Sequence, residues 1–379
     1  MIHAAQPDDA EAHFSYTLAR SDDAHDHACR LQHWKQRYEQ LSKGRFTGEV
    51  EEVWFGNVQI FRESTNQIVH QAGVAWEGSR TFGIPLEAEG EGWYCGEIFD
   101  RNLMLTLKGD DELDFRTPRK LDILAVTADM QVFGDYARRV EGRDIEAEIG
   151  RQRVICSVPE KAEELRSFLL TALNTVKAAP HLLEHATMRK ALEQAIFGSL
   201  LAAIGNGNEI PRRPSTSETR RQIVNRARDY MRQHVEEPIT MADLCAELNV
   251  SRRTLQYSFQ DVLGLNPVGY LRAMRLNGVR RALRQAEEIV SVADVAASWG
   301  FWHLSHFAAD YKAMFGELPS ETLRAQRLAP VDPSRLSLRR RRPVPRGPDM
   351  TYAIADRRGC GEFPQGKERA HGTPNTGAP

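Results

Sequence analysis

The sequence has few cysteines and no long hydrophobic run. Its five Cys are far apart and none forms a Cys-x-x-Cys pair, so neither a disulfide framework nor a zinc ribbon is expected. The apolar runs fall short of the about 18 residues that a membrane-spanning helix needs, and the first 30 residues carry five aspartates but no apolar core of a secretion signal. We therefore expect a soluble, cytoplasmic protein without a membrane partner.

Charge of one sign is not in excess either, because 50 Lys and Arg face 52 Asp and Glu, but the two signs are segregated along the chain. Residues 1–219 hold 25 basic and 35 acidic side chains, residues 220–327 hold 15 and 12, and residues 328–379 hold 10 and 5. This asymmetry is typical of a chain whose parts have separate tasks, and it places a polyanionic partner on the C-terminal side.

The hydrophobic pattern changes along the chain. The stretch Cys29–Leu41 has apolar residues at helical spacing and predicts a helix, whereas residues 46–126 form short β-rich runs separated by Gly, Asn and Asp. Helical patterns return between Met130 and Ile204. The expected fold class is α+β, with a β-rich, barrel or cupin-like sensor domain that also contains helices, followed by an all-α domain.

Composition predicts the domain boundaries. Residues 206–217 are rich in Gly, Pro and Ser and indicate a linker, whereas the residues past about 330 are rich in Pro, Gly and Arg without apolar periodicity. We expect a polar tail at 1–28, a sensor domain at 29–205, a linker at 206–217, a helical domain at 218–328 and a disordered basic tail at 329–379.

Within the helical domain the chain repeats itself after 51 residues. Thr240 and Asp243 form one capping box, in which a hydroxyl accepts from a backbone amide and an acid three residues on answers it, and Ser291 and Asp294 form the second. Each box begins a helix that is followed by a tight turn and a second helix, and both copies close on Gly-x-x-Pro. The tandem pattern predicts two helix-turn-helix units whose second helices can lie in the major groove of DNA.

One long helix is expected to join the two units. Val268–Gln285 shows 18 residues of uninterrupted helical pattern and would span about 27 Å, against about 34 Å between successive major grooves on one face of DNA. Its arginines are expected to contact phosphates and so to supply affinity for DNA. These arginines are Arg272, Arg275, Arg280, Arg281 and Arg284.

These motifs resemble those of a known family. Residues 223–323 resemble the DNA-binding domain of AraC/XylS-type transcription regulators, in which a long helix joins two helix-turn-helix units. Within that family, several short segments resemble the regulators of ethanolamine-utilisation operons, namely 46–49, 61–63, 82–85, 238–240, 251–256, 275–277 with 279–281, and 299–304.

The resemblance implies a function and partners. It implies a sequence-specific transcription activator that binds double-stranded DNA, works with RNA polymerase and responds to ethanolamine together with adenosylcobalamin, with a homodimer as one oligomeric state to consider. No cofactor is implied for DNA binding itself. The chain lacks the Asp-x-His-x-x-Gly arrangement known from base-off cobalamin-binding proteins.

The resemblance also implies which residues contact DNA. The family's base-reading places on the first recognition helix fall on Arg253, Gln256 and Tyr257, and Arg and Gln can make bidentate contacts to guanine and adenine. On the second recognition helix they fall on Ser305, His306 and Ala309, where two short side chains imply weaker base reading. The complete expected set is Ser251, Arg252, Arg253, Gln256, Tyr257, Arg275, Trp302, His303, Ser305, His306 and Lys312.

No catalytic or metal-binding set is found. His303 and His306 stand three residues apart but have no third ligand nearby in sequence, and His70 has no second His two residues away, unlike the metal sites of cupins. The remaining cluster consists of His25, Asp26, His27 and Cys29. It lies in a polar segment, and this composition favours a solvated tail over a metal site. An enzyme is therefore not expected, and the alternatives are a regulator of another amine or alcohol catabolic pathway or a cupin-like enzyme or small-molecule binding protein.

Overall fold

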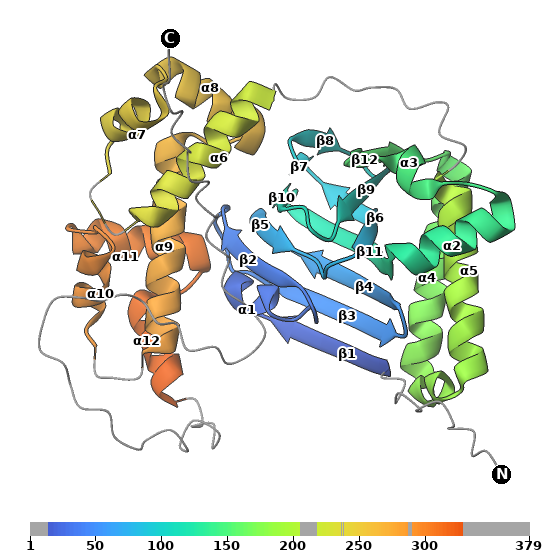
Figure 1. Ribbon diagram of the computed structural model, residues 1–379. Coiled ribbons are helices and arrows are strands. Elements are labelled where there is room, and N and C mark those ends of the chain that lie inside the picture. Colours follow the sequence, from blue (N-terminus) through green and yellow to red (C-terminus); the bar gives the residue numbers. More distant parts are fainter. Residues whose placement is uncertain (1–13, 205–217, 236, 238, 287–289, 329–379) are drawn as a thin grey trace, which may run out of the picture.

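The computed structural model describes residues 14–204, 218–235, 237, 239–286 and 290–328 (Figure 1). The expected linker at 206–217 and the expected C-terminal tail at 329–379 lie outside these residues. In the described part, two β-sheets with helices come first and a helical domain follows, so the α+β class is confirmed.

The front domain contains two antiparallel sheets. The larger has the order β1 (Phe14–Ser21), β3 (Gly48–Phe55), β4 (Val58–Thr65), β11 (Lys120–Asp129), β6 (Ser79–Glu89), β9 (Leu103–Lys108) and β12 (Val154–Cys156). The smaller has the order β2 (Lys35–Gln40), β5 (Val69–Val74), β10 (Leu113–Arg116), β7 (Gly92–Tyr94) and β8 (Glu97–Phe99). Both sheets are open in the described residues, so the expected closure into a barrel is wrong, and a cupin-like relationship stays a prediction.

The two faces of the seven-stranded sheet line two different cores. On β4, Ile60 belongs to the core shared with the helices, whereas the next residue, Phe61, belongs to the core between the sheets, because successive side chains of a strand point to opposite faces. The outer face is covered by helices (Figure 1), which are α2 (Met130–Glu141), α3 (Ile145–Ile149), α4 (Pro159–Ala178), the 3-10 helix η1 (Pro180–Glu184) and α5 (Ala186–Ile204).

The N-terminal residues differ from the sequence prediction. The polar tail predicted at 1–28 is wrong for residues 14–28, which form β1 and the short helix α1 (Ala24–Ala28). The helix predicted at Cys29–Leu41 is also wrong, since β2 occupies its second half. Gln36, Tyr38, Glu39 and Gln40 are all buried on β2, and because three of these four side chains are polar, the sequence lacks the alternation of polar and apolar residues that identifies a strand.

The helical domain consists, in the part of the chain that is described, of seven helices around one core, which also includes Leu41 of the front domain. They are α6 (Glu218–Gln233), α7 (Met241–Leu248), α8 (Arg252–Leu263), α9 (Pro267–Gln285), α10 (Val292–Ser298), α11 (Leu304–Phe315) and α12 (Pro319–Leu328). This domain lies beside the five-stranded sheet, on the side away from α4 and α5 (Figure 1).

A buried polar network joins the five-stranded sheet to the helical domain. His70 of β5 lies with Nε2 2.9 Å from Asp114 Oδ1, and the same carboxylate oxygen accepts from Arg228 of α6 at 2.8 Å. The Tyr270 hydroxyl of α9 lies 3.4 Å from Nδ1 of His70. Burial and the nearby charge of Arg228 lower the pKa of His70 to about 4, so its ring is neutral near pH 7. His70 is thus part of the contact between the two domains.

Two further findings concern cysteine and the membrane. Cys95 and Cys245 are free thiols, but Cys29 is disulfide-bonded, which the spacing of the cysteines did not predict. Among the helices of the described residues, none combines the length and the apolar character that crossing a membrane requires.

Candidate nucleic-acid interface

The first helix-turn-helix unit is built from local signals. The Asp243 amide donates to Thr240 Oγ1 at 3.2 Å, and the Thr240 amide donates to Asp243 Oδ2 at 2.8 Å, so the predicted capping box begins α7. Asn249 ends α7 with a φ of 52°, the left-handed conformation that this tight turn requires. Ser251 then caps α8 by accepting from the Thr254 amide at 3.1 Å.

Helix α8 buries one face and exposes the other. Leu255, Phe259 and Val262 lie in the domain core, so the expected base-reading residues point outward. The exposed set is Ser251, Arg252, Arg253, Gln256 and Tyr257, as the sequence placed it on the outer face. Tyr257 is 52% exposed, and the Arg253 guanidinium lies 5.3 Å from the centre of its ring, which orients the arginine along the outer face.

The second unit has the same plan with weaker caps. The Asp294 amide donates to Ser291 Oγ at 3.0 Å, while the Ser291 hydroxyl donates to Asp294 Oδ2 at 2.7 Å. The described contacts therefore show the hydroxyl half of the predicted second capping box, without a bond from the Ser291 amide. Helix α11 follows without a side-chain cap at His303.

Helix α11 also presents its predicted residues to solvent. Phe307, Tyr311 and Met314 are buried, whereas Trp302, His303, Ser305, His306, Ala309 and Lys312 are exposed. Trp302 is 87% exposed, which is unusual for so large an apolar side chain. His303 and His306 stack edge to face at 4.3 Å between ring centres, and Ser305 Oγ lies 3.1 Å from Nδ1 of His303.

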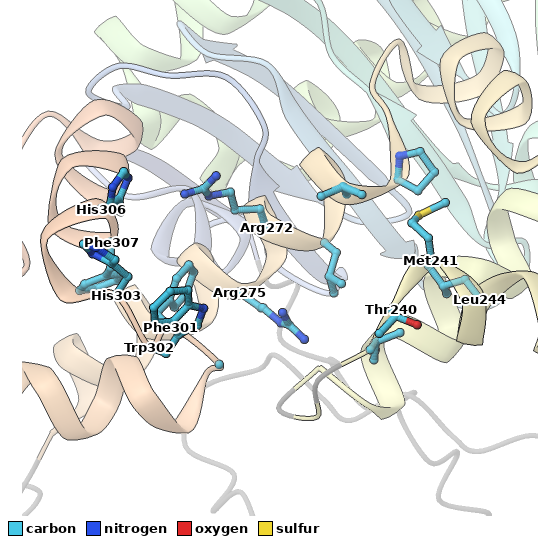
Figure 2. A pocket seen from close by; sticks show the side chains of 15 residues that line it. Thr240, Met241, Leu244, Arg272, Arg275, Phe301, Trp302, His303, His306 and Phe307 are labelled. Carbon is cyan, nitrogen blue, oxygen red and sulfur yellow. The ribbon is translucent and has the colours of Figure 1, made fainter. Parts of the chain in front are cut away.

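An apolar groove of about 510 Å³ separates the two units (Figure 2). Phe301 and Trp302 line one wall and Met241 lines the other, while Arg272 of α9 lies on its floor. The sequence prediction missed Met241, although the capping box directly before it indicates an exposed helix start. The groove thus brings the start of α7, the start of α9 and the turn before α11 to one surface.

Arg275 has a different position from the one predicted. It is half-buried and donates from Nε to the Val235 carbonyl at 3.1 Å and from Nη2 to the Glu237 carbonyl, so it holds the segment between α6 and α7. Burial lowers the pKa of its guanidinium. A purely phosphate-contacting role, as predicted, does not account for these two bonds.

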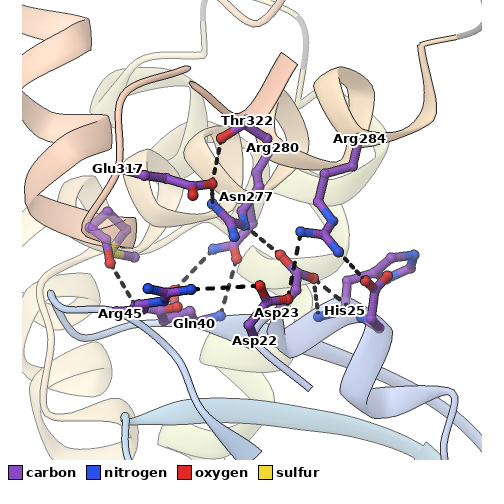
Figure 3. Close-up of polar contacts among 12 residues, drawn as sticks. Asp22, Asp23, His25, Gln40, Arg45, Asn277, Arg280, Arg284, Glu317 and Thr322 are labelled. Carbon is purple, nitrogen blue, oxygen red and sulfur yellow. Dashed lines mark hydrogen bonds and ion pairs between the residues drawn. The ribbon is translucent and has the colours of Figure 1, made fainter. Parts of the chain in front are cut away.

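Arg280 and Arg284, two other arginines of α9 that were predicted to contact phosphates, point toward the front domain instead. Arg280 is buried, pairs with Asp23 of the front domain and donates to Glu317 Oε1 at 2.7 Å (Figure 3). Arg284 pairs with Asp26 at 2.5 Å. The predicted phosphate role of these two arginines is wrong, because α9 turns this face toward the front domain. Arg281 is partly buried beside them, and burial lowers its pKa.

Arg272 is the exposed arginine of this helix in the described residues. It forms an ion pair with Asp310 of α11, which ties the long helix to the second recognition helix. Its guanidinium stays at the surface of the groove, where an anion can reach it.

The predicted N-terminal histidine cluster is not a solvated tail. His27 is buried and its ring lies against Phe46 at 5.4 Å between ring centres. In the described residues, no group of three or more His, Cys, Asp or Glu side chains is placed to hold one metal ion. His303 and His306 likewise have no third ligand beside them there.

Several known proteins are similar to part of this chain. A helix-turn-helix domain family model matches residues 244–325. The probable thc operon regulatory protein of Rhodococcus erythropolis is 40% identical over 103 residues, which are 27% of this chain and 31% of that protein. The XylDLEGF operon transcriptional activator 2 of Pseudomonas putida is 34% identical over 110 residues, which are 29% of this chain and 70% of that protein.

The solved structures give a similar result. A probable AraC family transcriptional regulator from Rhodopseudomonas palustris is 34% identical, covers 28% of this chain and 97% of its own, and has a TM-score of 0.27. The match to the thc operon regulator spans less than a third of that protein's length. The residues that the family model matches, 244–325, lie in the helical domain.

Proposed function

Because the chain belongs to the AraC/XylS family of transcriptional regulators, we propose that it reads one DNA duplex with both helix-turn-helix units, α8 and α11 lying in successive major grooves. The observation that carries this proposal is that α8 and α11 each expose polar side chains on one face and bury apolar side chains on the opposite face. Helix α9 runs unbroken over 19 residues between them and spans about 28 Å. A connector of this length suits two grooves one turn apart on a single duplex.

The two helices are expected to contribute unequally to specificity. Arg253 and Gln256 on α8 offer bidentate contacts to guanine and adenine edges, whereas Ser305 and Ala309 on α11 reach a shorter distance. The exposed Trp302 offers an apolar face to a thymine methyl group or to the sugar backbone. The first unit thus supplies most of the base reading.

Affinity without sequence preference would come from phosphate contacts. The exposed starts of α7 and α8 present backbone amides, and the exposed Arg252, Arg272 and Lys312 add positive charge. The inward-turned Arg280 and Arg284 take no part in this contact.

The DNA site is tested by selecting bound duplexes from a random pool with the full chain and then footprinting them. We expect an asymmetric site with two short elements about 10 bp apart, because the two recognition helices differ in sequence and are rigidly joined. A palindromic site that binds two chains and protects one element per chain would contradict reading by one chain.

The finer part of the proposal concerns activation. We propose that the front domain responds to ethanolamine together with adenosylcobalamin and that the protein activates transcription with RNA polymerase. Supporting this are the sequence segments that resemble ethanolamine-utilisation regulators. The cavity between the two sheets measures about 40 Å³, so a corrinoid does not fit there and would have to bind at a surface.

A regulator of another amine or alcohol pathway is the competing function. The discriminating observation is the set of genes adjacent to this one. Genes for the subunits of an ethanolamine ammonia-lyase would favour the first assignment, and their absence, together with genes for a different amine oxidase or alcohol dehydrogenase, would favour the second.

A further inference from the structure

The front domain has a small cavity between its two sheets. Its volume is about 40 Å³, and strands of both sheets contribute to its wall. A site for one water needs roughly 10 to 15 Å³ on this measure, so the cavity has room for a ligand of about three or four heavy atoms. Drug-sized and cofactor-sized molecules, which need hundreds of cubic ångströms, are excluded.

The wall combines aromatic rings with one carboxylate. Trp34 and Phe61 meet edge to face at 5.8 Å, and Tyr94 and Phe115 meet edge to face at 5.4 Å. Glu63 of β4 is 3% exposed and lies among them. Its Oε1 accepts from Gln71 Nε2 at 3.2 Å.

We propose that this cavity binds a small primary ammonium ion, with Glu63 as its counter-ion and the aromatic rings around its apolar part. The inference rests on the proposed function, because the ammonium ion would be the effector of the regulator. A buried carboxylate is costly unless a cation accompanies it, and aromatic faces attract cations. A ligand that carries its own carboxylate is repelled by Glu63, and a neutral ligand of the same size brings no charge to pair with Glu63.

Glu63 also connects the cavity to helix α1. Glu63 Oε1 lies 3.2 Å from Nε2 of His27, which precedes the end of α1 by one residue. Neither ring nitrogen of His27 makes a hydrogen bond. The ring is fully enclosed by its neighbours, and a Cβ on Gly48 would stand 2.6 Å from it. A cation that enters the cavity therefore changes the charge that His27 faces, in a place where the ring has no spare room.

Helix α1 carries this change to the helical domain. Asp23 caps α1 by accepting from the amides of His25 and Asp26 through Oδ1, and its Oδ2 pairs with Arg280 of α9 (Figure 3). Asp26, one residue before His27, pairs with Arg284 of α9. The residue that faces Glu63 and the residues that hold α9 thus belong to one short helix and its N-cap.

The coupling has a thermodynamic consequence. If the ammonium ion favours one placement of α1, it changes the affinity for DNA, and DNA changes the affinity for the ammonium ion by the same factor. Couplings of this kind typically amount to a factor of about 5 to 150.

The cavity is tested by calorimetry on the full chain with ethylammonium and ethanolamine, and with ethanol as the neutral molecule of matched size. We expect both amines to bind and ethanol not to bind. Glu63→Gln should weaken amine binding at least about tenfold, whereas Glu52→Gln should keep it, because Glu52 is an equally buried carboxylate outside this cavity.

A second variant keeps the charge and removes the space. Gly83 lines the cavity, and a Cβ there would lie 3.1 Å from the flexible end of Ile123, so Gly83→Ala should fold and still exclude the amine. Equal binding of ethanol and ethylammonium, or wild-type amine affinity in both Glu63→Gln and Gly83→Ala, would overturn the proposed site.

The route through α1 is tested by measuring DNA affinity with and without ethylammonium. We expect at least a fivefold effect of the amine in the wild type. In the double variant Asp23→Asn/Asp26→Asn, which removes both pairs to α9, the amine should still bind but its effect on DNA affinity should approach unity. Glu49→Gln, which removes a carboxylate paired with Arg20 inside the front domain, should retain the effect. A wild-type effect in the double variant would rule out this route.

Failure of this inference is distinguishable from failure of the proposed function. If the wild-type chain binds no specific DNA site in the absence of amine, that result would count against the proposed function. Specific DNA binding with no amine binding would leave that function intact and would overturn the inference about the cavity.

Discussion

Arg280 and Asp23 form a buried ion pair although 257 residues separate them in the sequence. The pair joins the helix that connects the two DNA-reading units to the first turn of the front domain's α1. Glu317 accepts from the same guanidinium at 2.7 Å, so Arg280 is neutralised from both domains. The sequence alone predicts that Arg280 contacts a DNA phosphate, but in the structure its charge holds the front domain against α9.

Removing one partner of this pair should destabilise the full chain. Asp23→Asn is expected to lower the free energy of unfolding by about 3 kcal/mol, the low end for a broken buried pair, since Glu317 still faces Arg280. Chemical denaturation measures this change. The double variant Asp23→Asn/Arg280→Met should lose less stability than the sum of the two single losses, because both single changes break the same pair. A fully additive double variant would contradict the pairing.

The same pair predicts a dependence on pH. Burial alone would raise the pKa of Asp23, but the charge of Arg280 outweighs it and the pKa is lowered. An acid whose folded pKa is depressed contributes stability above its unfolded pKa, near 3.9, and loses it as pH falls through the folded value. The stability difference between wild type and Asp23→Asn should thus narrow below about pH 4, and a constant difference down to pH 2 would contradict this assignment.

Local patterns made the helical domain predictable. The hydroxyl and acid of Thr240 and Asp243 act within one turn, and Asn249 supplies a left-handed residue at the place where the chain must bend. Such signals need no distant partner, and their recurrence after 51 residues identified the second unit. The same local character explains why the outward faces of α8 and α11 were predicted correctly.

Contacts between distant segments were not predictable in the same way. Nothing near Arg280 or Arg284 in the sequence indicates an acidic partner about 257 residues earlier. On β2 the buried glutamines removed the alternation of polar and apolar residues that identifies a strand, so a helix was predicted in its place. The carboxylate of Glu63 became a candidate ligand group only when its strand was placed opposite the aromatic residues of the other sheet.

Arg253 should carry specificity at one base pair. Arg253→Ala is expected to cost about 1 to 3 kcal/mol on the selected site and to relax the preference there, as loss of a bidentate base contact does. Arg253→Lys keeps the charge but not the bidentate geometry, so it should lose specificity while retaining binding to random DNA. Competition binding with single-base variants measures both effects, and equal losses on specific and random DNA for both variants would refute a base contact.

Arg275 and Arg272 should behave differently although they lie one turn apart on α9. Arg275→Ala is expected to lower the free energy of unfolding by about 1 to 3 kcal/mol, because it removes charged donors from two carbonyls. Arg272→Ala should leave stability nearly unchanged and reduce the slope of log affinity against log salt by about one unit if it contacts a phosphate. Anisotropy titrations at several salt concentrations, with thermal unfolding alongside, separate the two roles. A reduced salt slope in Arg275→Ala with unchanged stability would reverse this assignment.

Adenosylcobalamin, if it is an effector, should bind with its own lower axial ligand in place. The cavity between the sheets is far smaller than a corrinoid, and the chain lacks the Asp-x-His-x-x-Gly arrangement that supplies a replacement histidine in base-off proteins. The visible spectrum of the cofactor mixed with the full chain should therefore stay close to that of the free cofactor, while calorimetry reports binding. Ethanolamine should change the corrinoid affinity if the two sites are coupled, and the corrinoid should change the ethanolamine affinity by the same factor. If neither compound binds the full chain, the ethanolamine assignment fails, whereas DNA recognition, which rests on the two repeated units, is unaffected.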